Sequence, residues 1–573
     1  MKKYIYLLPF VLLVGCQDLA VTNNNEPDRQ QALAQPADLV SLLEGSSATA
    51  LVTGLTGFNA IYTDLLADQS STTNAYAGFW DYAEQPRLRL QNSTSNPDIG
   101  VIANPWSYWN RSISTANTLL TIIESDGQSI VVDGEDITES VHAAAYFLRG
   151  ISSGYISLTY DKGYVVGIND NVTSIQLTDY ESVNNAAIAD FDQAIQIAQN
   201  ASPNFSYSAV TGNQNTWSKN EFIDIVNSFA AKVLASMPRT FDEANNSSHW
   251  QRVQQYADKG LGGPNSLSSL NNFVFETISS GTLPYNFADW RGFVLSTDAG
   301  YLPNDQKIAH LLDPNNQPAD YPTADGVILP PVQSEDPRAS YFFYTEDFGY
   351  LRASRNRALF TNHWNFRMWA GNDWWEGGYP IPVLTQSEMI YIRAEAAIFQ
   401  GNMAVAADLL NNSPAGNSPL NFEYDLPSVQ LGYFTNESAH LSGGQVFDGT
   451  ESLSDLQWTL LKEYSIELDL MGGFGNHWFM MRRHDLLQEG TPLHYPVPAG
   501  ELEITGSEVY SFGGAGYTSE IGTADGSNSW KNLYAKTSYS KVRNESVSYS
   551  PLKSNNPTKL STKENQRIKG KAE

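Results

Sequence analysis

The sequence predicts a mainly α-helical protein in which tetratricopeptide-like helix pairs form a scaffold, with a loop-rich irregular face and few short strands. Apolar side chains recur every three or four residues in many segments, which is the period of a helix with one buried face. These segments come in pairs with short connections, as in stacked helix–turn–helix units. Long stretches rich in Gly, Pro, Asn and Asp separate the pairs and supply the irregular face.

The first apolar stripe steps along Leu51, Leu55, Phe58, Tyr62 and Leu65. Each stripe is interpreted as the buried face of one helix. The helix pairs expected from these stripes are residues 106–124 with 140–160, 181–200 with 220–237, and 387–401 with 404–412.

Composition narrows the function. Charged residues are only 17% of the 573, whereas aromatic residues reach 12%, with 30 Tyr, 25 Phe and 13 Trp. The net charge of −28 repels phosphate backbones and anionic membrane surfaces, so nucleic-acid binding is disfavoured. A single cysteine rules out an internal disulfide and Cys-rich metal sites.

The N-terminus has the features of a lipoprotein signal peptide. Lys2 and Lys3 precede an apolar run over residues 4–14, which is too short to cross a hydrocarbon core of about 30 Å. The run ends in Leu-Val-Gly-Cys16, which resembles a bacterial lipobox. We therefore expect residues 1–15 to be removed and Cys16 to carry the lipid anchor.

The rest of the chain divides by composition. Residues 16–45 are expected to be the lipidated Cys and a polar tether, and the acidic residue at Asp18 resembles the surface-export signal of Bacteroidota lipoproteins. Residues 46–530 are expected to form one domain with variable loops. Residues 531–573 are rich in Lys and Arg and are expected to be a disordered tail.

Common catalytic and metal motifs are absent or misplaced. The G-x-S-x-G pattern around Ser152 falls inside a helical stripe, whereas a nucleophile elbow needs a strand–turn–helix context. His477 and His484 can share a helical face but lack a third ligand. No cofactor is expected; the acid-rich loops leave calcium open without indicating it. No carboxylate pair is singled out for glycoside hydrolysis.

Four ordered motifs carry a family resemblance. They are Ile392-Arg393-Ala394-Glu395-Ala396 with Gly401; Glu463, Glu467 and Leu468 leading through Gly472 and Trp478 to Arg482, Arg483 and Leu486; Tyr495-Pro496-Val497-Pro498 with Glu501 and Leu502; and Tyr146-Phe147-Leu148-Arg149-Gly150 with Tyr155, Leu158 and Tyr160. Together with the lipobox they resemble the SusD/RagB family of nutrient-binding lipoproteins. Residues 471–477 depart from the family's usual Glu-Gly, and the basic tail is extra.

The resemblance implies a non-enzymatic, lipid-anchored outer-membrane protein that faces the cell exterior. It would capture glycans and hand them to a TonB-dependent outer-membrane transporter. Two alternatives stay open: a surface glycoside hydrolase that uses two carboxylates, and a RagB-like binder of peptides or glycopeptides. The motifs themselves are expected to hold the scaffold, with Trp478 in the core and Glu467 bonded to Arg482.

The ligand site is therefore expected in the loops. Sugar faces stack on aromatic rings while amide and guanidinium groups bond hydroxyls. Two aromatic stretches, residues 77–87 and 284–291, have this composition, and residues 372–376 are a further candidate. The predicted stacking rings are Trp80, Tyr82 and Trp290, and the predicted hydrogen-bond donors are Arg87, Asn286 and Arg291.

Overall fold

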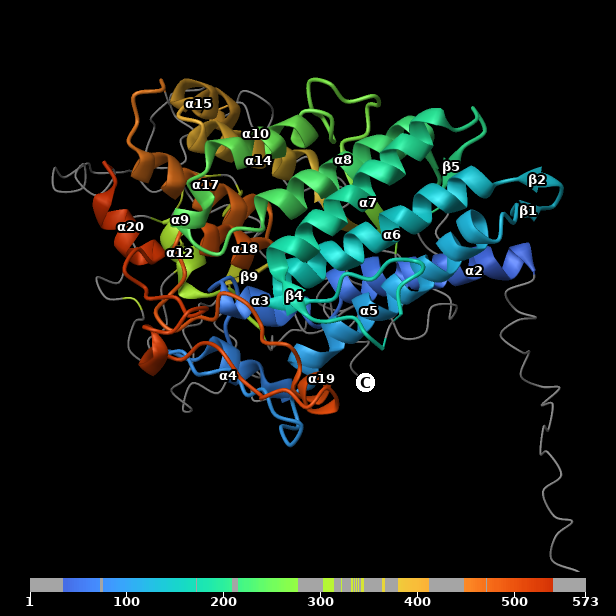
Figure 1. Cartoon of the computed structure of the whole chain (residues 1–573). Helices are drawn as coiled ribbons and strands as arrows, with labels where there is room; N and C mark the ends of the chain where they lie inside the picture. Colours follow the sequence, from blue (N-terminus) through green and yellow to red (C-terminus); the bar gives the residue numbers. More distant parts are fainter. Residues whose placement is uncertain are drawn as a thin grey trace, which may run out of the picture.

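The computed structural model describes residues 35–72, 76–171, 173–208, 215–276, 302–313, 381–411, 448–469 and 471–538, with isolated residues between 321 and 380. Helices dominate this part of the chain, and its strands are two to six residues long (Figure 1). The predicted fold class, mainly helical with few short strands, is confirmed.

The folded part of the chain begins closer to the N-terminus than the composition suggests. Helix α2 (Pro36–Ser47) begins with proline in its first turn, where the missing N–H costs nothing, and it buries Leu39 and Leu43. The expected tether boundary at residue 46 thus lies inside a helical segment. That segment continues as the π-helical η1 (Ala48–Thr56), turns at Gly57 and resumes as α3 (Ala60–Leu66). The first apolar stripe is therefore two helices.

By length and hydropathy, the segment Pro36–Leu66 is the one helical stretch among the described residues that is sufficient to cross a membrane. Half of its apolar window is buried inside the protein. The segment lies beside α5 and α6 in the body of the fold (Figure 1). Its hydropathy is thus explained by core packing.

Four long helices form a layer: α5 (Gly100–Leu120), α6 (Thr138–Thr159), α7 (Tyr180–Asn200) and α8 (Lys219–Ala235). Each packs on the next in chain order, which confirms the first two expected pairs. The ring of Phe147 meets the rings of Phe191, Tyr207, Phe222 and Phe229 at centroid distances of 5.4–6.2 Å. We call α5–α8 the helix layer.

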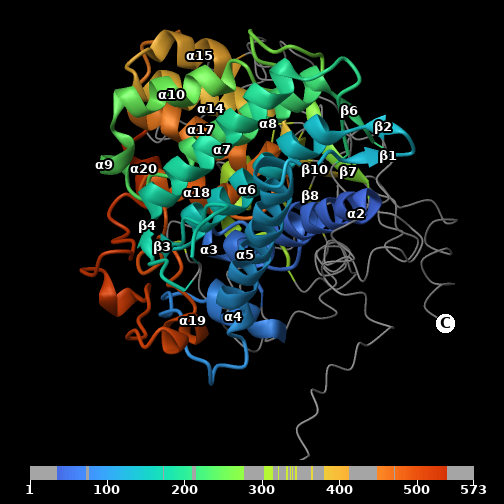
Figure 2. The same cartoon turned by 45° about the vertical axis from the view of Figure 1, so that its right-hand side comes forward.

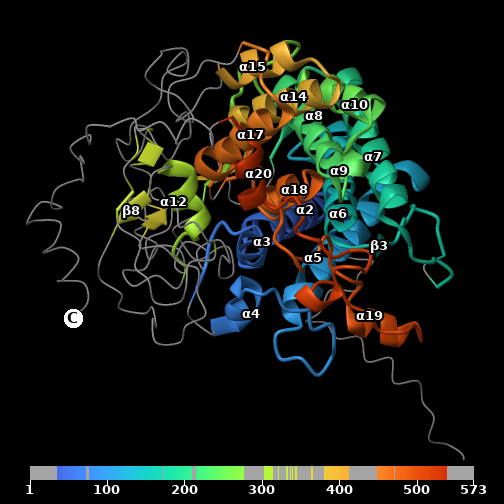
Figure 3. The same cartoon turned by 90° about the vertical axis from the view of Figure 1, so that its left-hand side faces the viewer.

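A second group of helices covers the helix layer. Helix α10 (Ser247–Ala257) packs on α8 and on α14 (Gln386–Phe399), and α14 pairs with α15 (Met403–Asn411) as expected. Helix α17 (Leu453–Glu467) packs on α14, on α20 (Trp530–Lys536) and on α12 (Gln306–Leu312). In Figure 3, α14, α17 and α20 lie between the helix layer and α12.

The C-terminal boundary also moves. Trp530 and Leu533 of α20 are buried, and the backbone N–H of Ser538 donates to Asp455 of α17 at 2.7 Å. Residues 531–538, expected in the tail, are therefore part of the folded body.

Trp478 is fully buried and donates to the carbonyl oxygen of Pro492 at 2.9 Å, as expected for a core residue.

The strands form five two-stranded antiparallel sheets among the described residues. The longest pairs β7 (Asn272–Glu276) with β10 (Pro380–Thr385), next to α14. The β1–β2 hairpin extends beyond one end of α6 (Figure 2). The other pairs are β1 (Val131–Val132) with β2 (Glu135–Asp136), β3 (Lys162–Gly163) with β4 (Thr178–Asp179), β5 (Ser206–Tyr207) with β6 (Trp217–Ser218), and β8 (Phe342–Tyr344) with β9 (His363–Asn365).

Short helices complete the fold and carry the connections. They are η2 (Tyr76–Gly78), α4 (Phe79–Ala83), η3 (Thr121–Ser125), α9 (Phe241–Ala244), α18 (Asn476–Arg483), α19 (Ala499–Ile504) and η7 (Ala515–Tyr517). Helices α4 and α19 lie together at the lower end of the molecule in Figures 1 and 2.

Candidate functional site

Two of the sequence motifs meet through buried charges. Glu395 of α14 accepts hydrogen bonds from Arg483 Nε at 2.5 Å and Nη2 at 2.7 Å, and His484 Nε2 lies 2.8 Å from the same carboxylate. Burial raises the pKa of this carboxyl, but Arg483 and the hydrogen bonds outweigh burial, so the pKa of Glu395 is lowered. These contacts fix α14 against α18.

A second charged centre lies around Arg338. Its guanidinium donates to Glu463 at 2.8 and 2.9 Å and to Asp336 at 2.8 and 3.0 Å, and Tyr391 Oη also donates to Glu463 at 2.8 Å. Glu467 lies 3.7 Å from the same guanidinium. We call these two centres together the charged core; the first consists of Glu395, Arg483 and His484.

The expected hydrogen bond between Glu467 and Arg482 is wrong. Arg482 donates instead to the backbone carbonyl oxygens of Leu158, Ser236 and Leu493 at 2.7–2.8 Å. Leu158 and Ser236 lie at the C-terminal ends of α6 and α8, where helices leave carbonyl groups without partners. Arg482 therefore joins helix ends, as expected for a residue that holds the scaffold. Its partners are backbone carbonyl groups and not Glu467.

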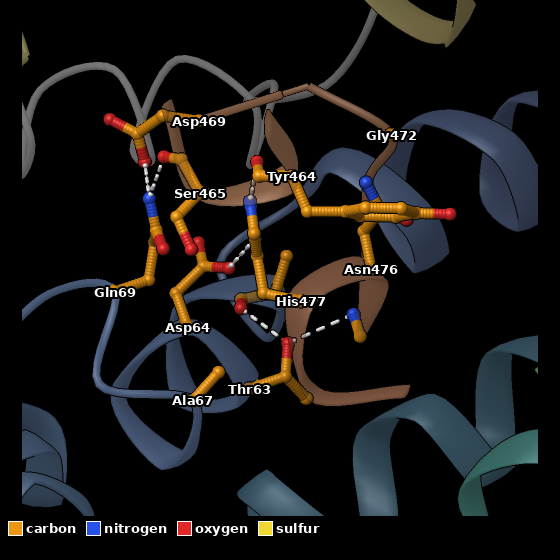
Figure 4. Close-up of polar contacts among 12 residues, drawn as sticks. Thr63, Asp64, Ala67, Gln69, Tyr464, Ser465, Asp469, Gly472, Asn476 and His477 are labelled. Atoms are coloured by element: carbon orange, nitrogen blue, oxygen red, sulfur yellow. Dashed lines mark hydrogen bonds and ion pairs between the residues drawn. The ribbon is translucent and has the colours of Figure 1, made fainter. Parts of the chain in front are cut away.

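Polar contacts also tie α3 to the turn between α17 and α18 (Figure 4). Gln69 Nε2 donates to a backbone carbonyl of α17 and to Asp469 Oδ1, both at 2.7 Å. His477 Nε2 lies 3.0 Å from the carbonyl oxygen of Tyr464, and Nδ1 lies 3.5 Å from Asp64. Because a carbonyl only accepts, Nε2 carries a proton here. The N-terminal helices are thus locked to the C-terminal motif.

The serine and histidine motifs set aside in the sequence are buried in the fold. Ser152 is buried in the middle of α6, away from any strand–turn–helix elbow. His477 and His484 have the separate partners described above. Over the described ranges, no group of three or more His, Cys, Asp or Glu side chains is placed to hold a metal ion.

Trp80 lies on a short segment, residues 76–87, that we call the Trp80 segment. It starts with a turn in which Ala77 has φ +51° and Gly78 has φ +72°. Its positive φ favours glycine at position 78, and an added Cβ would also lie 2.9 Å from Asp98 Oδ2. Phe79 then anchors α4 in the core, and Trp80 is half-buried beside it.

Two other predicted contacts in this segment point inward. Tyr82 is 9% exposed and its ring lies 4.9 Å from that of Tyr62; burial raises the pKa of its phenol. Arg87 is 3% exposed, forms an ion pair with Asp68 and donates to the carbonyl oxygens of Tyr82 and Leu65. The burial of both side chains leaves Trp80 as the accessible member of the predicted group, so Tyr82 and Arg87 shape the segment instead.

Gln85 adds a donor that the sequence analysis missed. Its side chain is half-buried, and Nε2 has no hydrogen-bond partner among the described residues. Buried amide groups normally have partners, so an unpaired donor on the same segment as Trp80 makes Gln85 a candidate ligand contact. Pattern alone did not distinguish Gln85 from the other amides of this amide-rich chain.

Several predicted site residues lie outside the described residues. These are the lipidation residue Cys16 and the second loop with Asn286, Trp290 and Arg291. Residues 372–376 lie outside as well. Their roles stay predictions. Within the described residues, the candidates for ligand contact are therefore Trp80 and Gln85, on a segment held by Tyr82 and Arg87.

The described residues thus form a helical scaffold that carries the half-buried Trp80 on a short, anchored segment. Such an arrangement suits binding by ring stacking and amide hydrogen bonds.

No family model matches the chain, and no curated protein matches it either. Its fold is similar to that of solved SusD superfamily structures. One, from Parabacteroides distasonis, has a TM-score of 0.50 at 12% identity and covers 83% of this chain and 97% of its own. A SusD homologue from Bacteroides fragilis has a TM-score of 0.50 at 15% identity and covers 81% and 93%. The chain therefore has the SusD-like fold.

Proposed function

We propose that this chain is a SusD-like glycan-binding lipoprotein of the cell surface, without catalytic activity. The observation that carries the proposal is the half-buried ring of Trp80, held on an anchored segment of a SusD-like fold that also carries the unpaired donor of Gln85. The ordered sequence motifs and the aromatic, amide-rich composition support the same function.

The anchor and the partner complete the proposal. Cys16 would hold the protein in the outer membrane, facing the exterior, and bound oligosaccharide would pass to a TonB-dependent transporter. Cys16→Ala should move the protein out of the detergent phase while ligand binding persists.

Co-purification from gently solubilised membranes tests for the transporter. Recovery of this chain always alone, at native expression levels, would contradict the transporter partner.

Substitution of Trp80 tests the binding function. A ring stack is worth about 1–3 kcal/mol on alanine substitution. Trp80→Ala should therefore weaken binding of the best ligand roughly tenfold, at about 1.4 kcal/mol per decade. Calorimetry with malto-, cello-, xylo- and manno-oligosaccharides measures it.

The melting temperature should stay unchanged, and Trp80→Phe should recover part of the affinity because it keeps a ring. A lower melting temperature with unchanged affinity would show that Trp80 is a packing residue.

Two other functions are distinguished by simple assays. A surface glycoside hydrolase would release reducing ends steadily from polysaccharides, whereas the proposed binder would not. A binder of peptides or glycopeptides would take up those ligands in the same calorimetric series and ignore free oligosaccharides.

A further inference from the structure

We propose that Tyr62 and Arg87 are positioning residues that orient Trp80 for its ligand by fixing the two ends of helix α4. This inference rests on the proposed glycan-binding function. Neither side chain needs to touch the ligand. Each donates a hydrogen bond to a backbone carbonyl at one end of the helix: Tyr62 to that of Ala77, two residues before α4 begins, and Arg87 to that of Tyr82, in its last turn.

The entry to α4 is held by Tyr62. Its hydroxyl donates to the carbonyl oxygen of Ala77 at 2.6 Å, while its ring packs against Phe79 at 5.1 Å and Tyr82 at 4.9 Å. Ala77 has φ +51°, a left-handed conformation that an L side chain rarely adopts. Such a conformation persists only where its surroundings enforce it, and the bond from Tyr62 does so here.

The exit from α4 is held by Arg87. Its guanidinium donates to the carbonyl oxygen of Tyr82, the penultimate residue of α4, and to that of Leu65 in α3 at 3.1 Å. The same group pairs with Asp68, whose second oxygen accepts from Trp530 Nε1 at 3.0 Å. The contacts of Arg87 and Asp68 therefore connect α4 through α3 to the C-terminal helix α20.

These anchors matter because α4 has only five residues. A helix of this length is not stable by itself, so its orientation depends on tertiary contacts. The hydrogen bonds from Tyr62 and Arg87 hold the backbone at Ala77 and Tyr82, on either side of Trp80 in the chain. Holding the ring in place before the ligand arrives removes the cost of ordering it on binding.

Tyr62→Phe tests the proposal because it removes one hydroxyl and keeps the ring packing. We expect the affinity for the best-binding oligosaccharide to fall about threefold to tenfold with little change in melting temperature. Hydrogen exchange of the backbone over residues 76–83 should become faster. Tyr155→Phe is the matched control: Tyr155 is equally buried, but its hydroxyl has no hydrogen-bond partner in the described part of the chain, so neither quantity should change.

A double-mutant cycle separates positioning from general structure. In a Trp80→Ala background, Tyr62→Phe should cause no further loss of affinity, because the ring that it positions is gone. Arg87→Lys keeps a charge beside Asp68 but loses the guanidinium group that bonds several partners at once. It should reduce the affinity as Tyr62→Phe does, with no further loss in the Trp80→Ala background.

The outcomes are distinct. Additive losses of affinity in the cycle would overturn the proposal, as would unchanged exchange over residues 76–83 in Tyr62→Phe. Absence of oligosaccharide binding to the wild-type protein would overturn the glycan function instead. In that case the exchange measurement still decides whether Tyr62 holds the segment.

Discussion

The helix layer and the charged core are both buried, but different forces hold them. In the helix layer, aromatic rings and small residues interlock: Gly150 leaves room for the ring of Phe191, which would lie 2.8 Å from an added Cβ. In the charged core, Glu395 meets Arg483 and His484 with almost no solvent contact. Apolar packing responds to volume, whereas a buried ion pair responds to the loss of its partner. The loss of folding stability caused by mutations in the two regions should therefore differ in magnitude and in pH dependence.

The largest effect is expected from Glu395→Gln. The change leaves Arg483 and His484 buried without their carboxylate, and loss of one partner of a buried pair costs about 3–5 kcal/mol. The free energy of unfolding, measured in urea at pH 7, should fall by this amount. Glu124→Gln is the matched control, because Glu124 pairs with His142 at the surface and should cost about 1 kcal/mol or less. Equal losses would contradict the comparison.

Acid should reduce the difference between wild type and Glu395→Gln. The pKa of Glu395 in the folded protein lies below its ordinary 4.5, because Arg483 and the hydrogen bonds outweigh burial. The unfolded chain then binds the proton first, so the stabilisation is present above pH 4.5 and is lost as the pH falls through the lowered pKa. Urea unfolding between pH 7 and 3 should show the two proteins converging. A constant difference would mean that the carboxylate charge is not responsible.

A smaller effect is expected in the helix layer. Gly150→Ala places a methyl group 2.8 Å from the ring of Phe191 and 3.2 Å from the carbonyl oxygen of Ala187. Overpacking of this kind costs about 1–3 kcal/mol and carries no charge, so the loss should be the same at pH 7 and pH 4. Gly45→Ala in α2 is the control, since nothing lies within 4 Å of its added Cβ. It should be neutral or stabilising by up to about 1 kcal/mol. Equal costs would exclude packing as the cause.

The smallest effect is expected at a helix terminus. Ser218 caps α8 in a reciprocal capping box with Glu221, and Ser218→Ala should cost about 1 kcal/mol. Ser529 precedes α20 in the same position but makes no side-chain capping bond, so Ser529→Ala should cost less. Melting temperatures of the two variants measure this difference. The reverse order would show that the cap contributes little to a helix buried in this layer.

The local pattern predicts the helices well and the site only in part. Periodicity locates the helices of the layer and their pairing because each helix buries one face of its own sequence. The same reasoning selects Trp80, Tyr82 and Arg87 as one group by residue type. It cannot separate them by burial, because a five-residue helix has too few turns to define a face, and the partners of Tyr82 and Arg87 come from α3.

The sequence by itself determines the helical class, the order of the helix pairs and the motifs that hold them, since these follow from local spacing and residue type. Tertiary structure alone decides that Arg482 joins helix ends while Arg483 pairs with Glu395. The two arginines are neighbours in the chain and identical in chemistry. Only the direction that each takes from α18 in the folded protein brings one to open carbonyl groups and the other to a carboxylate more than eighty residues away.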